Sequence, residues 1–410
     1  MPREDTNPHR AGWDISSRCL ICESKSLLEL LQIFGVPIHC NTLWPTRESA
    51  RQAPKGDIDL VFCTHCGHTF NRAFRPASVQ YGEEYENSLY FSPTFRRYSE
   101  QLVGRLTAEF ELHDKAIVEV GSGSGDFLRA LCRNGRNRGI GFDPTYAAPD
   151  STPDHVTFCA DLFSAKYSDI KADFVCSRHV LEHVADPPDV LGAIREALLR
   201  SARAYGYFEV PNADFLFEGG SVWDIIYAHA SYFSRTSLVN LFETAGFEVL
   251  RAEPYFNGQF LGIDFCIPNG RPRELLPVLP PPGLLPSVAR FPRLYKDTVA
   301  YWTDRVHSLT AMGRRVAVWG GGAKCVSFLQ AVAGSCPIPY VVDVNPRKHR
   351  QFVPGSGAEI VPPEFLAQFQ PDVVIVMNPI YRDEIQVTLD DLGLGSVEIE
   401  SLHAMAEALV

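Results

Sequence analysis

A glycine-rich loop between an apolar run and a helical pattern is the part of this chain best suited to hold a ligand. Ala116–Val120 is expected to form a buried parallel strand, and Gly-Ser-Gly-Ser-Gly follows it at 121–125. Glycine lets the backbone turn sharply and approach a ligand that a Cβ atom would repel. The helix expected after the loop would direct its free N–H groups and the positive end of its dipole at that ligand. We therefore predict one set of ligand-binding residues here: Glu119, Gly121, Ser122, Gly123 and Gly125.

Two acidic residues at the ends of later strand candidates narrow the identity of this ligand. Asp143 ends the run that begins at Gly139 and suits a ribose diol, and Asp161 follows a third strand candidate and suits an adenine amine. The loop alone fits NAD, FAD or S-adenosylmethionine. The order of glycine loop, ribose acid and adenine acid is more similar to that of a class I methyltransferase than to that of a dehydrogenase. We therefore predict S-adenosylmethionine, with a nicotinamide cofactor or an unliganded α/β turn as the alternatives.

Four cysteines have the spacing of a metal site. Cys19 and Cys22 form one Cys-x-x-Cys pair, and Cys63 and Cys66 form another. Two such pairs supply the four thiolates of a tetrahedral zinc site. A redox motif and unrelated core thiols are the alternatives, but a redox motif needs only one pair. We predict a structural Zn²⁺ in a module too small to hold itself together without the metal.

The composition is that of an ordinary globular protein with an acidic balance. The chain has 410 residues, 45% of them hydrophobic and 21% charged, with a net charge of −11. An acidic surface lacks the basic excess that nucleic acid or an anionic membrane requires, so neither is expected as a partner. The polar N-terminus has no apolar signal-peptide core and no apolar run reaches the length of a membrane span, so we expect a cytoplasmic protein.

The order of apolar runs, helical patterns and prolines predicts four segments. The zinc module occupies 1–75, and a doubly wound parallel sheet of the α/β class occupies 76–266. A proline-rich linker and a helix beginning at about Arg293 occupy 267–312. A second, Rossmann-like α/β domain occupies 313–410.

The second α/β unit has a glycine loop of its own. The strand expected at Val316–Trp319 leads into Gly320-Gly321-Gly322, and Asp343 ends the next strand, where a ribose-binding acid would lie. Cys325 occupies the place of the third glycine of a dinucleotide fingerprint. NAD binding is therefore less favoured here than contact with a nucleotide-bearing substrate or a purely structural role.

Four polar segments are expected at the carboxyl edge of the first sheet or folded over it, where open α/β sheets bind ligands. They are Arg178–His183, Phe208–Asn212, Tyr227–Ser234 and Tyr85–Ser92. With the two cysteine pairs and the two glycine loops, these segments resemble the bacterial sugar C-methyltransferases over nearly the whole chain. That family methylates a keto sugar carried on a nucleotide diphosphate. It combines an N-terminal zinc module, a methyl-donor domain and a C-terminal Rossmann-like domain.

The resemblance implies a mechanism through an enolate. A base removes the proton from the carbon beside a ketone, and the enolate attacks the methyl group of the donor. His229 is in register with the family's proposed base, and Tyr227 and Tyr85 are candidate donors to the enolate oxygen. The resemblance also assigns Glu209 and Asn212 to the sugar hydroxyls. We place His179 beside the methyl donor.

One position departs from the family pattern. The family carries an acid immediately before the histidine base, and this chain has Ala228 there. The reaction could therefore use another residue, a non-sugar acceptor, or methylation at oxygen or nitrogen. A donor-binding scaffold without catalytic activity is the non-enzymatic alternative.

Overall fold

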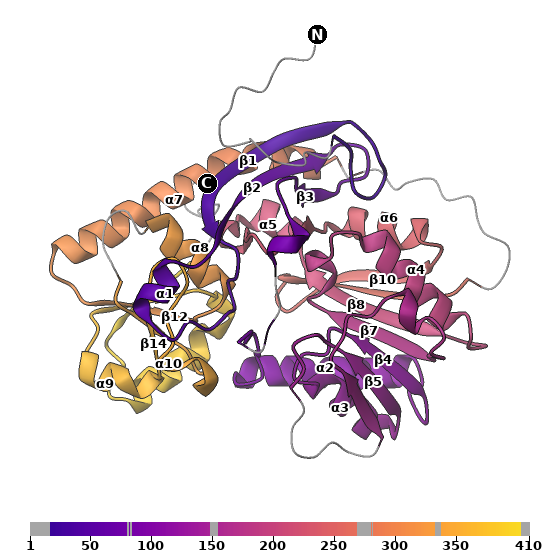
Figure 1. Ribbon diagram of the computed structural model, residues 1–410. Coiled ribbons are helices and arrows are strands. Elements are labelled where there is room, and N and C mark those ends of the chain that lie inside the picture. Colours follow the sequence, from indigo (N-terminus) through magenta and orange to yellow (C-terminus); the bar gives the residue numbers. More distant parts are fainter. Residues whose placement is uncertain are drawn as a thin grey trace, which may run out of the picture.

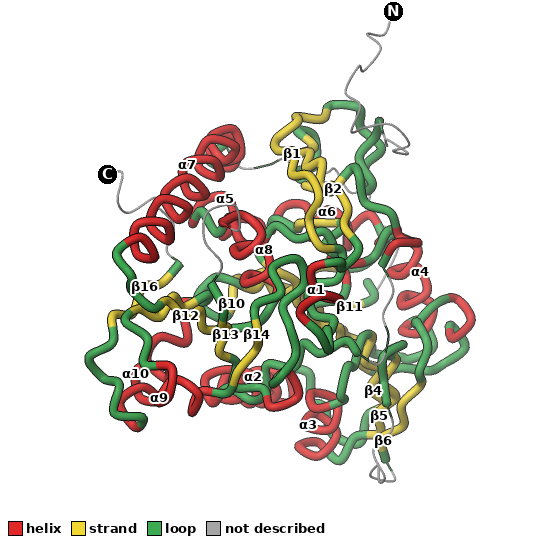
Figure 2. Tube along the Cα trace, turned by 60° about the vertical axis from the view of Figure 1, so that its left-hand side comes forward, coloured by secondary structure: helices red, strands yellow, loops and turns green. Residues whose placement is uncertain are grey.

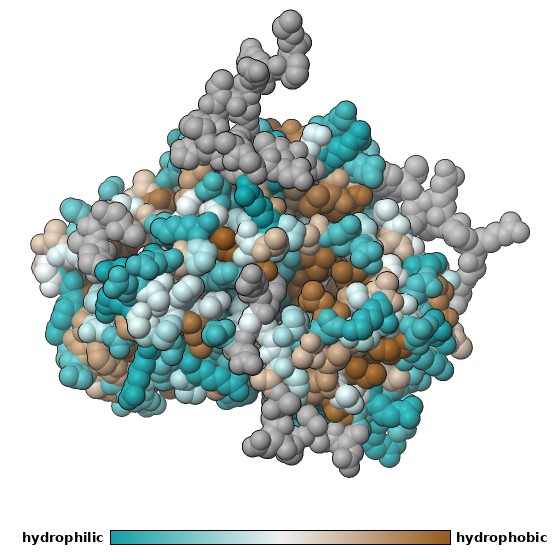
Figure 3. All heavy atoms as spheres, in the orientation of Figure 1, coloured by the Kyte–Doolittle hydropathy of each residue, from teal (hydrophilic) through white to brown (hydrophobic). Residues whose placement is uncertain are grey.

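The described residues form three β-sheets, and one long helix, α7 (Leu284–Ala311), lies beside the N-terminal sheet and the C-terminal domain (Figure 1). The structure is a computed structural model that describes residues 17–79, 82, 84–147, 155–268, 280, 282–332 and 338–402. No helix in these ranges combines the length and the apolar character that a membrane crossing requires. On the face drawn in Figure 3, hydrophilic side chains are spread widely and apolar ones gather toward the right.

The N-terminal sheet is antiparallel and has the order β1-β2-β3-β9. Its first three strands are β1 (Leu27–Pro37), β2 (Lys55–Cys63) and β3 (Thr69–Asn71), with the short helix α1 (Arg47–Arg51) between β1 and β2. The fourth strand, β9 (Ser231–Tyr232), comes from the middle of the chain and pairs with β3. The cysteine-bearing module is therefore joined by backbone hydrogen bonds to the segment that carries His229.

The central sheet is that of a class I methyltransferase, as predicted. Its order is β10-β11-β8-β7-β4-β5-β6, with β7 and β5 on either side of β4. Six strands run in one direction, because β11 is antiparallel to both of its neighbours. Figure 2 shows α3 beside the end of this sheet that contains β4, β5 and β6. The strands are β4 (Ala116–Val120), β5 (Arg138–Phe142), β6 (Val156–Cys159), β7 (Phe174–Arg178), β8 (Tyr205–Pro211), β10 (Glu248–Tyr255) and β11 (Phe260–Cys266), and the helices are α2 (Pro93–Glu109), α3 (Asp126–Gly135), α4 (Pro187–Leu198), α5 (Ala213–Gly219) and α6 (Arg235–Thr244).

The prediction of a purely parallel sheet was wrong at this edge. Strands β10 and β11 form a hairpin around Phe256, Asn257 and Gly258, which all have positive φ. Asn-Gly is a strong hairpin signal, because both residues tolerate the left-handed region that a tight turn needs. The sequence carried this signal.

The C-terminal sheet is fully parallel and has the Rossmann order β14-β13-β12-β15-β16. Both switch points, between β4 and β7 and between β12 and β15, open at the carboxyl ends of their strands. The strands are β12 (Val316–Trp319), β13 (Tyr340–Val342), β14 (Glu359–Val361), β15 (Val373–Val376) and β16 (Glu398–Ser401), and the helices are α8 (Ala323–Val332), α9 (Leu366–Phe369) and α10 (Arg382–Asp391).

Helix α7 (Leu284–Ala311) begins about nine residues earlier than the sequence analysis predicted. Pro286 lies in its first turn, where a backbone N–H has no helical partner, so proline is tolerated there. Pro292 lies inside the helix and removes one hydrogen bond. Apolar packing outweighs that loss, since Val288 and Phe291, in the turn before Pro292, are fully buried. Residues 269–279 and 281 of the expected linker lie outside the described residues.

One apolar core joins the N-terminal sheet, α5, α7 and the C-terminal sheet. It includes Phe62 of β2, Phe217 of α5, Phe291 of α7 and Val318 of β12. The central sheet has one core on each face, and one of these also contains Cys19, Ile21, Cys63 and Cys66 of the N-terminal module. The cysteine-bearing module and the C-terminal domain therefore share one core with α5 of the methyltransferase domain. The predicted boundaries at 75, 266 and 312 remain predictions.

Candidate active site and metal centre

The loop after β4 is shaped by three glycines with positive φ, namely 74° at Gly121, 51° at Gly123 and 82° at Gly125. A Cβ added at Gly121 would lie 2.0 Å from the Val180 side chain, and one at Gly125 would lie 2.2 Å from the Phe158 ring. At Gly123 the same atom would meet nothing within 4 Å. The two outer glycines are required by close packing, and the middle one faces the open space in which a ligand can lie.

Asp143 holds this loop from the end of β5. Its Oδ2 accepts a hydrogen bond from the Gly123 N–H at 2.7 Å, and its Oδ1 accepts from the Thr145 N–H at 2.8 Å. The Thr145 hydroxyl also donates to Oδ1 at 2.6 Å, so Oδ2 is the oxygen that keeps a lone pair for a further donor. The predicted ribose acid therefore lies directly at the glycine loop.

Asp161 lies next to Asp143, because the N–H groups of both residues donate to the Cys159 carbonyl, at 2.9 and 3.0 Å. Its carboxylate accepts from Lys166 Nζ at 2.8 Å and from the Tyr167 hydroxyl at 2.6 Å. These two hydrogen bonds lower the pKa of Asp161 to about 2. The predicted adenine acid is ionised and exposed beside the ribose acid.

Two polar atoms beneath the glycine loop lack a partner in the described part of the chain: Glu119 Oε2 and Ser122 Oγ. Both side chains are buried, and burial raises the pKa of Glu119 to about 8. Orphaned polar atoms at a loop of this shape are what the polar end of a ligand would satisfy. The residues present therefore fit S-adenosylmethionine, with the glycine loop, Glu119 and Ser122 at one end and Asp143 and Asp161 at the other.

Glu209 does not lie where a sugar hydroxyl could reach it, which corrects its assignment to substrate binding. Its side chain is 1% exposed, and Arg178 Nε donates to Oε1 at 2.9 Å. The hydroxyls of Tyr98 and Tyr207 both donate to Oε2. Burial alone would raise the pKa of Glu209, but the Arg178 guanidinium and the His179 ring, whose Nε2 lies 3.3 Å from Oε1, hold it well below its usual range. Glu209 is a structural anion that positions Arg178 and His179.

Tyr227 also lies away from any acceptor, contrary to the prediction of a catalytic role. Its side chain is 2% exposed, its ring fills the space beside Gly56, and its hydroxyl accepts from the Arg75 N–H at 3.2 Å. It is part of the core that the N-terminal sheet shares with α5, α7 and the C-terminal sheet. Tyr85 is better placed: the residue is half-buried, and its hydroxyl lies 3.4 Å from the amides of Asn41 and Asn87 and faces the carboxyl group of Glu182.

His229 lies in a buried cluster with three residues of the turn after β7. Its ring centroid is 4.9 Å from that of His183, whose Nδ1 donates to the Ala228 carbonyl at 2.9 Å. One carboxylate oxygen of Glu182 and one ring nitrogen each of His183 and His229 lie within 4.8 Å of one another. His179 has a φ of 55° and lies 3.7 Å from Glu182 through its Nδ1. Burial holds the pKa of His229 well below its usual value, and the nearby imidazoles lower it further.

A cavity of about 280 Å³ lies between the carboxyl edges of the central and C-terminal sheets. The central sheet contributes Asn212 and Phe260, and the C-terminal domain contributes residues from the ends of β12, β13 and β15. His229 lies one side chain behind this wall, since its ring contacts Tyr232 at 5.5 Å between centroids and Tyr232 lines the cavity. The C-terminal lining is Trp319, Gly320, Gly322, Ala323, Lys324, Asp343, Val344, Lys348, Val376, Met377, Asn378, Tyr381, Glu384 and Ile385.

Asn212 lies on the cavity wall, but both ends of its amide are engaged. Nδ2 donates to the Gly258 carbonyl at 2.8 Å, and Oδ1 accepts from the Asp214 N–H as the N-cap of α5. The sequence analysis missed the pair formed by Gln259 and Asn378, whose amides exchange two hydrogen bonds of 3.0 and 2.8 Å across the two domains. Asn378 lies two residues after β15, so its place just beyond a strand end was the available signal.

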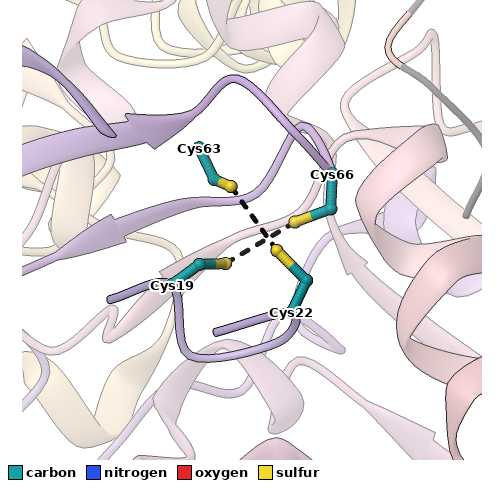
Figure 4. A group of neighbouring side chains, drawn as sticks. All are labelled: Cys19, Cys22, Cys63 and Cys66. Atoms are coloured by element: carbon teal, nitrogen blue, oxygen red, sulfur yellow. Dashed lines mark hydrogen bonds between the residues drawn. The ribbon is translucent and has the colours of Figure 1, made fainter. Parts of the chain in front are cut away.

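The four cysteines Cys19, Cys22, Cys63 and Cys66 converge as predicted (Figure 4). The Sγ atoms of Cys19 and Cys66 are 3.5 Å apart, and those of Cys22 and Cys63 are 3.6 Å apart. Tetrahedral zinc with Zn–S bonds of about 2.3 Å places its sulfurs about 3.8 Å apart. The donor set and its spacing therefore fit a structural zinc ion.

Comparison with known proteins agrees with this architecture. Residues 94–252 match a family model described as a methyltransferase domain, and residues 287–393 match one described as a C-methyltransferase C-terminal domain. The chain is 24% identical over 387 residues to the C-methyltransferase NovU of Streptomyces niveus, covering 90% of each protein.

Solved structures share part of the fold at low similarity. The N1-methyltransferase of 1,6-didemethyltoxoflavin from Burkholderia thailandensis is 16% identical, with a TM-score of 0.33, over 43% of this chain and 79% of that one. The [4+2]-cyclase SpnF is 14% identical, with a TM-score of 0.37, over 45% of this chain and 86% of that one. The central sheet, its glycine loop and the two family matches together establish the class: the chain is an S-adenosylmethionine-dependent methyltransferase.

Proposed function

We propose that this methyltransferase transfers its methyl group to carbon, on a keto sugar carried by a nucleotide diphosphate. The observation that carries the proposal is the cavity between the carboxyl edges of the two sheets. The edge of the central sheet also carries the methyl-donor loop, and the edge of the C-terminal sheet carries the second glycine loop and Asp343. The match of 287–393 to a C-methyltransferase C-terminal domain supports transfer to carbon. The similarity to NovU, a C-methyltransferase, along 90% of both chains also supports transfer to carbon.

The reaction balances without a further reagent. The C–H bond beside the ketone breaks, its electron pair forms the enolate, and the proton goes to a base of the protein. S-adenosylmethionine supplies an electrophilic methyl group, and its sulfur keeps the electron pair of the broken bond. The products are the methylated ketone, S-adenosylhomocysteine and one proton. The protein must therefore supply a base, donors to the enolate oxygen and alignment.

His229 is the residue that we propose as the base. Burial and the neighbouring imidazoles keep the pKa of His229 low, so the ring is neutral and its Nδ1 has no partner in the described part of the chain. Its side chain is 9% exposed, and its ring contacts Tyr232, which lines the cavity. Tyr85, with a pKa that burial raises to about 12, remains protonated and can donate to an enolate oxygen.

The C-terminal domain would hold the nucleotide part of the acceptor. Its cavity wall combines backbone N–H groups at the start of α8 with two ammonium groups, Lys324 and Lys348. Lys324 Nζ is 2.7 Å from Asp224, and Lys348 Nζ is 3.4 Å from Asp343. Cationic side chains beside a helix N-terminus suit phosphate oxygens.

The test of this function is the His229→Asn variant assayed for two reactions. We expect turnover to fall by about 10²–10⁴, the usual contribution of a general base, while affinity for S-adenosylmethionine is kept. Exchange of solvent deuterium into the carbon beside the ketone should fall in parallel, because that step needs the base and not the methyl group. Wild-type rates of both reactions in the variant would overturn the assignment. A labelled methyl group found on oxygen or nitrogen would overturn carbon transfer.

We also propose that zinc at Cys19, Cys22, Cys63 and Cys66 positions the segment that carries His229. The second cysteine pair leads directly into β3, which pairs with β9, and the Asn71 N–H donates to the Ala230 carbonyl at 3.0 Å. Asn240 of α6 donates to the Cys66 carbonyl. Metal analysis should find about one zinc per chain. Cys22→Ser should lose the metal and lower deuterium exchange while keeping methyl-donor affinity. Folded, active protein with less than a tenth of that zinc would contradict the proposal.

A further inference from the structure

A buried imidazole that accepts a proton needs a nearby anion. Proton transfer to His229 creates a cation in a water-poor cluster, and an isolated buried charge costs several kcal/mol. The acid that would balance it in the resembling family is replaced here by Ala228, whose side chain carries no charge. The question is which group of this chain takes that place.

Glu182 has the position for this role, and one of its carboxylate oxygens has no hydrogen-bond partner in the described part of the chain. It lies in the turn Leu181–His183 directly after β7, and its side chain is 1% exposed. Its Oε1 is 4.0 Å from His183 Nε2 and 3.7 Å from His179 Nδ1. Its Oε2 accepts no hydrogen bond from the residues that the structure describes. The carboxylate therefore points into the imidazole cluster with one oxygen uncommitted.

The cluster holds no permanent cation for this carboxylate. Within the described ranges, no lysine or arginine forms an ion pair with Glu182. The neighbouring carboxylate of Glu209, in contrast, forms an ion pair with Arg178 at 2.9 Å. The groups that face Glu182 are the rings of His179, His183 and His229, the hydroxyl of Tyr85 and the carboxylate of Glu209. Glu182 can therefore pair with the imidazolium of His229, a cation that exists only during the reaction.

His183 fixes the geometry of the cluster. Its Nδ1 donates to the Ala228 carbonyl, so Nε2 is unprotonated in the neutral ring and can accept a proton from its neighbours. This bond ties the turn after β7 to the residue just before His229. The side-chain oxygen and nitrogen atoms of Glu182, His183 and His229 lie within 4.8 Å of one another, a limit longer than a hydrogen-bond distance. Catalytic hydrogen bonds are often long without substrate and become shorter in the complex.

We propose that Glu182 supplies the carboxylate that position 228 lacks. When His229 takes the proton from the acceptor carbon, the Glu182 carboxylate pairs with the imidazolium, and His183 holds the two groups in line. The proton then leaves through the cluster, so no atom or charge accumulates over a turnover. Glu182 acts through His229 and is a positioning residue. The inference rests on the proposed role of His229 as the base.

A pH profile separates this role from a structural one. Burial raises the pKa of Glu182 to about 8, so the group is mostly protonated at neutral pH and ionises as the pH approaches 8. Turnover of the wild type should therefore rise as the pH passes through about 8 and level off above it. Glu182→Gln keeps the shape of the side chain but cannot ionise, so its profile should lose that rise.

The experiment compares Glu182→Gln with the wild type at saturating methyl donor and a keto sugar nucleotide. We expect kcat to fall about 10- to 100-fold, part of the range for acid–base groups, with KM within about twofold. Thermal unfolding and donor affinity should not change. Glu182→Asp should recover part of the rate, and adding Ala228→Glu to Glu182→Gln should recover more. Glu196→Gln, at a 59% exposed side chain of α4, is the control and should behave as wild type.

The outcomes distinguish this inference from the proposed function. If His229→Asn is inactive but Glu182→Gln has wild-type kcat and pH profile, the inference fails and the base stands. If His229→Asn keeps both rates, the proposed function fails first. If the protein holds a second divalent ion that Glu182→Gln loses, and activity depends on that ion, the cluster is a metal site and the inference is overturned.

Discussion

The glycine loops after β4 and after β12 share one hydrogen-bond pattern. Asp143 Oδ2 accepts from the Gly123 N–H at 2.7 Å, and Asp343 Oδ2 accepts from the Gly321 N–H at 2.9 Å. In each case the other carboxylate oxygen accepts from the N–H two residues further along the chain, at 2.8 Å. An acid at the end of the second strand thus ties down the loop after the first strand in both sheets.

The surroundings of the two loops differ. The first has three glycines with positive φ, whereas in the second only Gly320 has one. Asp343 has Lys348 beside it at 3.4 Å, but in the described chain no lysine or arginine pairs with Asp143. Two residues before the first glycine, β4 carries Glu119 and β12 carries the apolar Val318. Similar patterns in the sequence therefore build an open, anionic ligand cradle in one sheet and a partly neutralised wall of the cavity in the other.

The comparison is tested most strongly by adding a methyl group to each loop. Gly125→Ala places a Cβ 2.2 Å from the Phe158 ring at a φ of 82°, whereas Gly322→Ala meets nothing within 4 Å. Strain and overpacking of about 2–3 kcal/mol should force the first loop out of this shape. Calorimetry should find affinity for S-adenosylmethionine about 30- to 150-fold lower in Gly125→Ala and unchanged in Gly322→Ala. Equal effects would show that the loops are not specialised.

Removal of each acid is the next largest test. Asp143→Ala should weaken binding of S-adenosylmethionine by about 1.5–3 kcal/mol, the range for a lost hydrogen bond to a charged group. Asp343→Ala should leave that affinity unchanged, because its loop faces the cavity and not the donor site. Both proteins are checked by circular dichroism for the native fold. Unchanged donor affinity in a folded Asp143→Ala protein would remove Asp143 from the donor site.

The second loop is expected to act on the acceptor. Asp343→Ala should raise KM for a keto sugar nucleotide about tenfold with little change in kcat, since it removes binding that does not depend on the transition state. Steady-state kinetics with acceptor varied at saturating donor measures the split. A fall in kcat with unchanged KM would instead assign Asp343 a part in the chemistry.

The smallest expected effect is on stability and comes from Glu119, which has no titratable counterpart in β12. Its pKa in the fold is about 8, above the unfolded value, so its stabilisation is complete at low pH and is lost as the pH rises through 8. Between pH 7 and pH 8 this loss is about 1 kcal/mol per group. Urea unfolding of Glu119→Gln should show that much less pH dependence than the wild type, and Glu182 accounts for a similar remaining slope. An unchanged slope would show that Glu119 is ionised in the fold.

Local sequence was sufficient for the elements and for the sites whose ligands are close along the chain. The glycine loop with Asp143 and Asp161, and the four cysteines, lie where the strand ends and the Cys-x-x-Cys spacing placed them, because each motif fixes its own backbone over a few residues. The spacing of strands and helices likewise determined the class I methyltransferase sheet and the parallel C-terminal sheet.

The tertiary structure decided which polar side chains are free to act. Glu209 and Tyr227 have suitable chemistry in the sequence, but Arg178 with Tyr98 satisfies one and the Arg75 N–H satisfies the other. Glu182 has His229 as a neighbour through a tertiary contact: β9, which follows His229, pairs with β3 of the cysteine-bearing module, and His229 lies beside the turn after β7. Burial and hydrogen bonding between segments far apart in the chain decide the pKa of a side chain and whether its polar atoms are left for a ligand. Sequence spacing does not record those contacts.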